Sequence, residues 1–400
     1  MYSVMSRTQL VLALNCGSSS IKATLFDMPS ENCVANLHVA DVGLKKGLWI
    51  LEQDGKITRG RTPFPTYEDG LRFVMRTLVT PQSQIAAVAH RVVHGGPHYV
   101  DSIRITAAVL RGIKDNTKLA PLHTPPNLKG IRIAQHTLPR VPHVAVFDTG
   151  FHKTIPDFAA AYPLPLRFYE KHFIRRYGFH GISYRYIIGE AARMMHRPLR
   201  SLKLIACHLG SGCSVCAIDG GKSIDTSMGF TPAEGIMMRT RCGDIDPGVL
   251  LHLQRALHFT PERLNTLLNH QSGLLGVSGG AATMPEVLRR RKAGDKAANL
   301  AFEMFCYRVE KYIGAYIATL GGIDGLVFTA GIGENQPEVR AQIVKWCRGF
   351  DLHIDPRKNQ RAVGRPLAIH RPHSRAAILV IPTNEGLMMA RDASTLLRAS

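Results

Sequence analysis

The stretch LVLALNCGSSSIKATLFD, residues 10–27, joins a continuous apolar run to a turn rich in glycine and serine, and then to a lysine. Residues 10–14 have the length of a buried strand. After the turn, Ile21, Ala23 and Leu25 alternate with their neighbours, which predicts a second strand and not a helix. Walker loops and dinucleotide-binding loops open into a helix, whose N-terminus holds phosphate. The pattern therefore predicts a β-hairpin with serines and Lys22 at its tip, which is either an ordinary polar turn or a phosphate-binding turn of another fold.

The same arrangement returns later in the chain. IACHLGSGCSVCAIDGGK, residues 205–222, is again a strand, a Gly-Ser turn and a strand. Such a repeat predicts two similar domains, and a cleft between them could hold a polyphosphate from both sides. A third glycine loop follows a strand in GLVFTAGIGENQPEVR, residues 325–340, where Pro337 suits the first turn of a helix. Its glycines would let a ligand approach the backbone closely.

Short apolar strands alternate with helical stretches along the whole chain, which predicts the α/β class. Strands are expected at residues 10–14, 21–26, 85–93, 143–147, 203–208, 214–218, 325–329 and 376–382. Helices are expected at residues 67–79, 183–195, 262–269, 299–320, 337–346 and 386–397. The length of 400 residues suggests two or more domains.

Composition limits the functional classes. No apolar run reaches the roughly 18–20 residues that a membrane span needs, and the N-terminus has no long apolar segment followed by a small-residue cleavage site, so we expect a cytoplasmic protein. The net charge of +20 favours anionic partners. The dense cluster RRRK at 289–292 has no interleaved aromatic residues, so specific nucleic-acid binding is not expected. The C-x-x-C pair at 213–216 has no second pair at zinc spacing, which favours free thiols there.

Several predicted strands or loops end in charged or polar side chains instead of ordinary turn residues. These are Arg91, Asp148, His152, His180, Arg241, Asp244, Asn384 and Glu385. Any one of them could be a surface ion pair or a cap, but open α/β sheets bind ligands at the carboxyl ends of strands. Arginine matches carboxylate and phosphate with two parallel hydrogen bonds, and oxygen ligands suit Mg²⁺. The set therefore indicates an anion and metal site of the kind that phosphoryl transfer needs.

A series of motifs along the chain carries a family resemblance. They are, in order, NCGSSSIK, HRVVHGG, APLHTPPN, VFDTGFH, RRYGFHGIS, CHLGSGCS, DTSMGFTPAEG, TRCGDIDPG, SGLLGVSG, FTAGIGEN and IPTNE. In order and spacing they resemble the acetate kinase (acetate/propionate kinase) family over nearly the whole chain. The resemblance implies two ribonuclease-H-like domains of the actin-like ATPase and sugar-kinase type around a nucleotide cleft. We expect one domain at residues 1–150 with a C-terminal helix at 386–400, and the nucleotide-binding domain at 151–385.

The resemblance also implies a homodimer that transfers phosphate reversibly from ATP to acetate, giving acetyl phosphate and ADP. Mg²⁺ is the implied metal, with Mn²⁺ as an alternative, placed by Asn15 and Glu385. The implied catalytic residues are Arg91, Asp148, His180 and Arg241. The implied nucleotide-binding residues are Ser18, Ser20, Lys22, His208, Leu209, Gly210, Ser211, Gly212, Thr283, Met284, Pro285, Gly331, Ile332, Gly333, Glu334 and Asn335. The acid is implied to contact Arg91, Val93, Leu122, His123, Phe179 and Pro232.

Two of these assignments invite a chemical comment. Acetate is already an anion at neutral pH and needs no proton removed, so we interpret Asp148 as orienting an arginine or a metal-bound water and not as a general base. Val93, in place of a smaller residue, favours acetate over propionate, but one methylene is worth only about 1–3 kcal/mol. A kinase for propionate or another short acid is therefore an alternative.

Four places depart from the family pattern. They are Ser211 for asparagine, Arg239 for glycine, Thr283-Met284-Pro285 for an Asp-x-Arg nucleotide contact, and Gly386 for a second acidic residue. Losing a charged hydrogen bond costs roughly 1.5–3 kcal/mol, so the third departure predicts weaker or altered nucleotide recognition. Arg239 could hold phosphate, or it could displace Arg241. The departures leave a nucleotide-binding homologue with reduced turnover as a further alternative.

Overall fold

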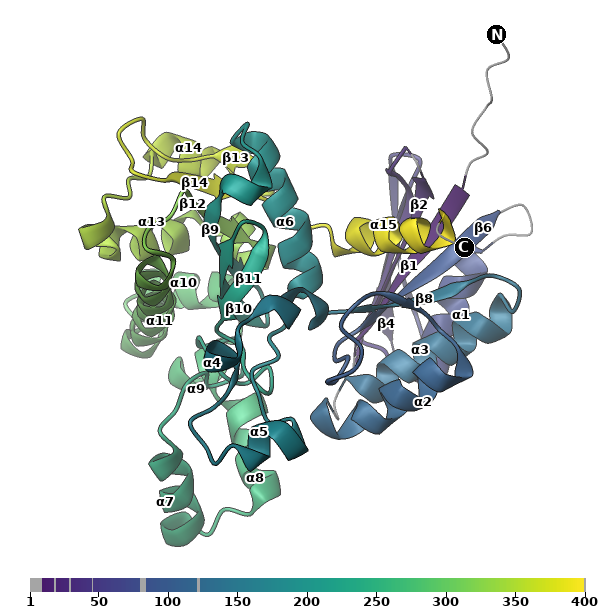
Figure 1. Cartoon of the computed structure of the whole chain (residues 1–400), viewed down its shortest axis with the longest axis horizontal. Coiled ribbons are helices and arrows are strands. Elements are labelled where there is room, and N and C mark those ends of the chain that lie inside the picture. The colour runs from purple at the N-terminus through teal and green to yellow at the C-terminus, as the bar shows by residue number, and fades with distance from the viewer. Residues whose placement is uncertain are drawn as a thin grey trace. The chain divides into compact units, whose positions relative to one another are not determined.

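The computed structural model describes residues 9–17, 19–28, 30–44, 46–79, 84–120 and 123–398. The chain folds into two compact units, which are treated separately below (Figure 1). Unit 1 comprises residues 1–150 and 384–400, and unit 2 comprises residues 151–383. Asn384 and Glu385 thus belong to unit 1, two residues before the expected boundary. Ser18 and Leu122, two of the predicted site residues, lie outside the described residues.

Unit 1 is built on an eight-stranded sheet in the order β5-β4-β3-β2-β1-β6-β8-β7. Its strands are β1 (Gln9–Cys16), β2 (Ile21–Met28), β3 (Asn32–Ala40), β4 (Gly47–Gln53), β5 (Lys56–Thr62), β6 (Ile85–Val92), β7 (Ile103–Arg104) and β8 (His143–Phe147). β1 and β2 form an antiparallel hairpin that pairs Asn15 with Lys22, so the hairpin predicted from the opening stretch is confirmed. β6 and β8 continue the sheet parallel to β1, which brings the carboxyl ends of these three strands to one edge.

The longer helices of unit 1 cover this sheet (Figure 1). They are α1 (Tyr67–Leu78), α2 (Ala107–Asp115), α3 (Thr124–Thr137) and α15 (Glu385–Arg398). α1 begins where Thr66 and Asp69 form a capping box, in which each side chain binds the other residue's backbone amide. α15 packs on β1, β2 and β6, and Arg391 donates to both carboxylate oxygens of Glu31 at 2.7 and 2.6 Å. The C-terminal helix is therefore part of the N-terminal unit.

The apolar core of unit 1 lies between the hairpin strands and α1. Leu12, Ile21, Leu37, Leu71 and Val74 are fully buried in it. These residues come from β1, β2, β3 and α1, so the alternating face of the opening hairpin supplies much of this core. Full burial of one such side chain stabilises a fold by about 1.5–3 kcal/mol.

Unit 2 repeats the same arrangement in a six-stranded sheet of the order β11-β10-β9-β12-β14-β13. Its strands are β9 (Lys203–Leu209), β10 (Cys213–Asp219), β11 (Lys222–Thr226), β12 (Gly325–Thr329), β13 (Leu367–Ala368) and β14 (Ala377–Val380). β9 and β10 are an antiparallel hairpin, and β12 and β14 run parallel to β9. The strand order and directions match those around β1 in unit 1, which confirms the internal repeat predicted from the two hairpin sequences.

The helices of unit 2 are α4 (Asp157–Ala160), α5 (Arg167–His172), α6 (Gly181–Met194), α7 (Pro247–Leu257), α8 (Pro261–Thr266), α9 (Gly273–Val277), α10 (Met284–Lys292), α11 (Lys296–Leu320), α12 (Ala330–Asn335), α13 (Pro337–Trp346) and α14 (Pro356–Arg361). Four of them, α6, α8, α11 and α13, overlap the helices expected from the sequence, and the other helices of unit 2 were not expected. The helix expected at 262–269 is confirmed as α8 up to Thr266, and its last three residues lie in a π-helical turn at Leu267–Gln271. α11 starts earlier than expected because the Asp295 side chain accepts from Ala298 N and caps it. Within the described ranges, no helix has the length and apolar character to cross a membrane.

The basic cluster at 289–292 lies on α10 and is partly neutralised inside unit 2. Arg290 pairs with Asp295 at 2.5 Å. Lys292 pairs with Glu338 of α13 at 2.6 Å. These contacts use the cluster to hold neighbouring helices together, so its charge is less available to an external polyanion than the sequence suggests.

Candidate functional site

Four predicted residues of unit 1 lie close together at the carboxyl ends of β1, β6 and β8, three of them on or directly after these strands and the fourth on α15. Arg91, near the end of β6, donates from Nη1 to Oδ1 of Asn15 on β1 at 3.2 Å. Its Nη2 forms an ion pair with Oδ2 of Asp148, which directly follows β8. Glu385, the first residue of α15, has Oε2 4.0 Å from Arg91 Nε. We call Asn15, Arg91, Asp148 and Glu385 the Arg91 cluster.

The Arg91 cluster is largely shielded from solvent. The side chain of Asp148 is 1% exposed, that of Arg91 19% and that of Glu385 21%. Burial raises the pKa of Glu385, and the charge of Asp148 adds to this rise against the opposing effects of Arg91 and Lys22. Burial works against the charge on Arg91, but Asp148 and Glu385 outweigh it and raise the pKa of Arg91. The arginine is therefore held charged by its own carboxylates.

The donor atoms of the Arg91 cluster fit a divalent cation. Asp148 Oδ1 is buried and makes no hydrogen bond within the described part of the chain. With the Glu385 carboxylate and the Asn15 amide oxygen it offers an all-oxygen set, and Mg²⁺ usually takes one or two carboxylates and completes its shell with water and substrate phosphates. The described residues hold no group of three or more His, Cys, Asp or Glu side chains that could bind a metal. Two carboxylates and one amide oxygen in the cluster are ligands of the type that Mg²⁺ takes from proteins.

The tip of the β1–β2 hairpin is closed by its own backbone. Gly17 N donates to Ser20 O at 2.9 Å, which spans the turn. Lys22 is exposed and pairs across the hairpin with Asn15, and its charge acts on Glu385. Lys22, which the sequence places at the tip of the opening hairpin, thus lies beside the Arg91 cluster.

Asn127 was not among the predicted residues, although it is the last residue of the motif APLHTPPN. Its Oδ1 accepts from Val93 N at 3.1 Å, and its Nδ2 donates to Cys16 O at 2.8 Å. This buried side chain ties the end of β1 to the residue after β6, and Val93 is buried as a result. His123 immediately precedes α3.

In unit 2, two predicted histidines stack on each other. The ring centroids of His180 and His208 are 4.0 Å apart, with 17° between the ring planes. Ser214 Oγ lies 2.8 Å from His180 Nδ1, and Ser183 Oγ lies 2.9 Å from His208 Nδ1. Ser183 Oγ also forms a hydrogen bond with Thr383 Oγ1 at 2.8 Å. These serines were not predicted, and their position inside the histidine-bearing motifs is the sequence signal for them.

Gly212 marks the point where His180 and Arg241 converge. A Cβ on Gly212 would lie 3.3 Å from His180 Nε2 and 3.5 Å from Arg241 Nη1. Arg241 Nη1 donates to Pro232 O at 3.2 Å, and burial lowers the pKa of Arg241 with no carboxylate among the described residues to oppose it. A guanidinium of this kind is suited to bind an anion. We call His180, Gly212 and Arg241 the Arg241 cluster.

The two glycine loops of unit 2 are neighbours. β9 and β12 run parallel with His208 paired to Thr329. A Cβ on Gly210 would lie 3.5 Å from Ala330 Cβ, and Ala330 has a left-handed φ of 63° where the chain turns from β12 into α12. The loops at 208–212 and 331–335, both predicted to bind nucleotide, therefore form one surface.

Arg340 was not predicted and is fully buried behind the second loop. Its Nη1 donates to Gly333 O at 2.7 Å and Glu334 O at 2.9 Å, and its Nε and Nη2 donate to Asn359 Oδ1 and O at 2.8 and 2.7 Å. Burial lowers the pKa of Arg340 to about 10. Glu334 Oε1 accepts from Thr383 N at 3.1 Å, so this side chain supports the fold. Hydrogen bonds from Arg340 and Thr383, both in unit 2, thus fix the loop at 331–335.

The structure also corrects some details of the predicted site. The side chains of Leu209, Met284 and Ile332 belong to the core, so these residues can offer a nucleotide only backbone atoms. Thr283 and Pro285, which flank Met284, are exposed. Phe179 and Pro232 belong to unit 2, whereas Val93 belongs to unit 1.

Arg239 is accommodated without a special backbone conformation. Its side chain is exposed, and it is not among the residues with positive φ, so the backbone does not need glycine at this position. Its N–H donates to Ser211 O at 3.2 Å, which joins two of the departures through backbone atoms. Arg239 therefore adds an exposed cation near the loop at 208–212.

Comparisons with known proteins agree with this geometry. A family model described as the acetokinase family matches residues 10–391. The chain is 45% identical over 399 residues to an acetate kinase of Halothermothrix orenii, covering 97% of this chain and 100% of the relative. Among solved structures, it is similar to Porphyromonas gingivalis acetate kinase, with a TM-score of 0.90, 38% identity and coverage of 97% and 100% of the two chains. It is also similar to a propionate kinase from Francisella tularensis, with a TM-score of 0.91, 37% identity and coverage of 97% and 99%.

The units have the duplicated ribonuclease-H-like fold of the actin-like ATPases and sugar kinases, as the matching strand orders of the two sheets indicate. Because the family model spans nearly the whole chain and the relatives match it from end to end, this chain belongs to the acetokinase family.

Proposed function

We propose that this chain is an acetate kinase, which reversibly transfers the γ-phosphoryl group of ATP to acetate and releases ADP and acetyl phosphate. The observation that carries this proposal is the Arg241 cluster, where a guanidinium without a carboxylate partner converges with a fixed histidine ring beside two glycine loops. Phosphoryl transfer depends on cations that neutralise the three equatorial oxygens of the migrating group. The acetate kinases among the relatives support the choice of acetate as acceptor.

The reaction needs no proton transfer in the forward direction. An acetate oxygen attacks the γ-phosphorus, a new O–P bond forms, and the bond from phosphorus to the ADP oxygen breaks with its electron pair. The guanidinium of Arg241 and the ring of His180 stabilise charge on the oxygens of the migrating group. Ser214 and the stacked His208 ring hold the His180 ring in place for this role.

The Arg91 cluster is proposed to bind the carboxylate and the metal. Asp148 is paired with Arg91, which supports the interpretation that it orients this arginine and does not act as a base. Asn15 and Glu385 would hold Mg²⁺ or Mn²⁺, with Asp148 Oδ1 as a further oxygen atom. When bound, the metal would neutralise phosphate charge. The protein groups align the acceptor carboxylate through Arg91.

Propionate kinase activity is the second candidate, because a propionate kinase is among the similar solved structures. The Francisella tularensis propionate kinase has a TM-score of 0.91 to this chain, beside 0.90 for the acetate kinase structure. Val93 is buried and fixed by Asn127, which favours the smaller acid. We therefore expect propionate to be a poorer substrate, by roughly tenfold.

We further propose a cytoplasmic homodimer. Support for the dimer comes from α7, on which no residue is buried and which projects from the end of unit 2 in Figure 1. Val249, Leu251 and Leu257 are exposed on it, and a group of exposed large apolar side chains on one element is typical of a protein–protein interaction site. Light scattering after gel filtration tests this: a monomer would contradict it.

The proposed activity is tested by trapping acyl phosphate with hydroxylamine. The purified chain is incubated with ATP, Mg²⁺ and acetate, propionate or butyrate, and the hydroxamate product is measured. We expect the highest kcat/KM with acetate and no product when Mg²⁺ is chelated. If no acid gives product while ATP still binds, the chain is a nucleotide-binding homologue without turnover.

A further inference from the structure

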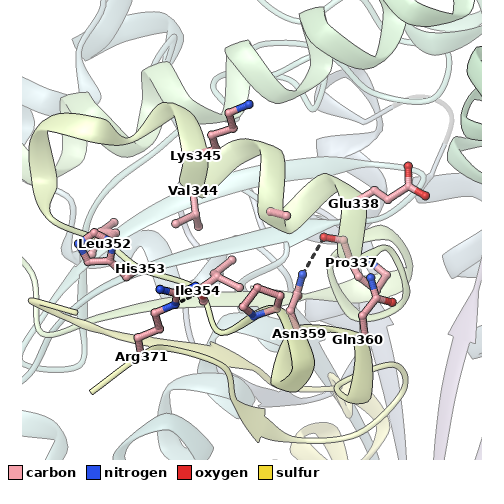
Figure 2. Close-up of a pocket in the computed structure, with 12 residues that line it drawn as sticks. Pro337, Glu338, Val344, Lys345, Leu352, His353, Ile354, Asn359, Gln360 and Arg371 are labelled. Carbon is pink, nitrogen blue, oxygen red and sulfur yellow. Dashed lines mark hydrogen bonds between the residues drawn. The ribbon is translucent and has the colours of Figure 1, made fainter. Parts of the chain in front are cut away.

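Unit 2 carries a pocket of about 470 Å³ that shares no residue with the predicted site (Figure 2). It is enclosed by α13, by α14 and by the segment between these two helices. Its apolar lining consists of Pro337, Ala341, Val344, Leu352, Ile354 and Pro356. Small-molecule sites usually have volumes of about 300–1,000 Å³ with mostly apolar walls and a few polar groups. The size and lining suit a small organic molecule.

The carboxylates around this pocket are already engaged. Glu338 pairs with Lys292 at 2.6 Å and points away from the middle of the pocket in Figure 2. Asp351 Oδ1 lies 2.7 Å from His353 Nε2. Asp355 accepts from two backbone amides at the start of α14. These partners occupy the carboxylates, and Asp355 in addition interacts electrostatically with Arg371, while the terminal nitrogens of Arg371 remain available to a ligand.

Two polar side chains of the lining, Arg371 and Gln360, lie at opposite ends of the pocket in Figure 2. Arg371 is at one end, anchored by its Nε, which donates to Ile354 O at 3.2 Å. Its two terminal nitrogens make no hydrogen bond within the described ranges. Gln360 is at the other end and is exposed. A guanidinium fork, an apolar middle and a carboxamide thus follow one another, which complements an elongated anion with an apolar body.

The pocket is connected to the second glycine loop by hydrogen bonds. Asn359, a lining residue, donates from Nδ2 to Pro337 O at 2.9 Å. The same side chain accepts from Arg340 Nε at 2.8 Å. Arg340 in turn holds the carbonyls of Gly333 and Glu334. A ligand against Asn359 and Pro337 would therefore stabilise the groups that hold this loop.

We propose that this pocket binds a small organic carboxylate with an apolar ring or chain, and that its occupation stabilises the loop at 331–335. The carboxylate binds the terminal nitrogens of Arg371, and the apolar body lies against Val344 and Ile354. The effect on the loop rests on the proposed function, because it assumes that residues 331–335 bind nucleotide. Binding itself does not depend on that assumption.

The experiment measures binding by isothermal titration calorimetry with 3-phenylpropionate as the probe. 3-Phenylpropanol, the uncharged analogue, and inorganic phosphate serve as comparison ligands. We expect saturable binding of 3-phenylpropionate to the wild-type chain, and weaker binding of both comparison ligands. Equal binding of the alcohol, or no binding of the acid at millimolar concentration, would overturn the proposal.

Three variants locate the binding site. Arg371→Gln should weaken binding roughly tenfold or more, because a charged hydrogen-bonded pair is lost. Ala341→Leu should abolish binding by filling the pocket from a helix position that accepts leucine. Arg357→Gln, a matched exposed arginine on α14 outside the lining, should leave binding unchanged. Equal loss in Arg357→Gln and Arg371→Gln would show a nonspecific charge effect and overturn the assignment.

The effect of pocket occupation on the loop at 331–335 is measured through the KM for ATP. With saturating 3-phenylpropionate, we expect the KM for ATP to fall several-fold in the wild type and not in Ala341→Leu, while the KM for acetate stays unchanged. Binding without any change in the KM for ATP would overturn the connection. If the chain has no kinase activity, ATP binding is titrated instead, so that failure of the proposed function is told apart from failure of the pocket.

Discussion

Two of the predicted site residues, Arg91 in unit 1 and Arg241 in unit 2, have opposite surroundings. Arg91 is paired with Asp148 and lies 4.0 Å from Glu385, and these charges outweigh burial and raise the pKa of Arg91. Arg241 donates to the Pro232 carbonyl, and burial lowers the pKa of Arg241. Arg91 is neutralised by the protein itself, whereas Arg241 keeps its charge for a ligand.

This difference separates stability from catalysis. Removing one partner of a buried ion pair leaves an uncompensated charge, which destabilises the fold. Arg241 donates to a neutral carbonyl and has no carboxylate partner among the described residues, so its removal leaves no buried carboxylate without a partner and takes away mainly what it would do for the ligand. We therefore expect the two arginines to give distinct phenotypes, and the following predictions test that contrast.

Arg241→Gln should give the largest loss of activity. We expect kcat to fall by about 10³-fold, because arginines that stabilise the charge of a migrating phosphoryl group contribute on this scale. The free energy of unfolding should change by less than about 0.5 kcal/mol. Steady-state kinetics and urea unfolding measure the two effects. A loss of stability equal to that of the Arg91 variant would contradict the contrast.

Arg91→Gln should affect both properties. We expect kcat/KM for acetate to fall by about 10²-fold, and the free energy of unfolding to fall by about 3 kcal/mol, because the buried Asp148 carboxylate loses its partner. The control is the double variant Arg91→Gln/Asp148→Asn, which removes the orphaned charge and should recover part of the stability without the activity. A double variant less stable than the single one would show that the pair is not the cause.

Gly212→Ala should act through crowding. Its Cβ would lie 3.3 Å from His180 Nε2, and the His180 ring is held by Ser214 and His208, so we expect kcat to fall by about 10- to 100-fold. Gly189→Ala is the matched control, because a Cβ there meets nothing within 4 Å in α6. It should keep activity and gain about 0.5–1 kcal/mol of stability. Unchanged kcat in Gly212→Ala would argue against convergence at this point.

His94→Asn should change only the acid stability of unit 1. His94 is buried, and burial lowers the pKa of His94 to about 4. Since the unfolded value is about 6.5, the folded state binds fewer protons, and stability present above pH 6.5 is lost as the pH falls toward 4. The loss at pH 5 should be about 2 kcal/mol.

Asparagine keeps an acceptor for Gly96 N, which donates to His94 Nδ1 at 2.9 Å, and it does not titrate. Urea unfolding at pH 7 and pH 5 measures the difference between the two pH values. This difference should shrink in the variant by about 2 kcal/mol. An unchanged difference would assign the acid sensitivity to other groups.

Some missed elements have few buried residues, although β3, which was also missed, has Ala35, Leu37 and Val39 in the core. The hairpin strands were predicted because their apolar faces alternate or run continuously. β5 has no buried residue and β4 has one, so these outer strands of the unit 1 sheet carry little apolar pattern and were missed. α7 was missed for the same reason, since none of its residues is buried.

The sequence by itself determined the two strand-turn-strand hairpins, the α/β class and the set of polar residues at strand ends, because these depend on neighbours a few positions away. Only the tertiary structure decided which charges meet. Arg91 and Asp148 are 57 positions apart, and local periodicity does not encode that they pair, or that Arg241 has no carboxylate partner among the described residues. The burial of Met284, the support of the glycine loop by Arg340 and the pocket beside α14 likewise arise from packing between distant segments, where contacts follow from the shape of the whole unit.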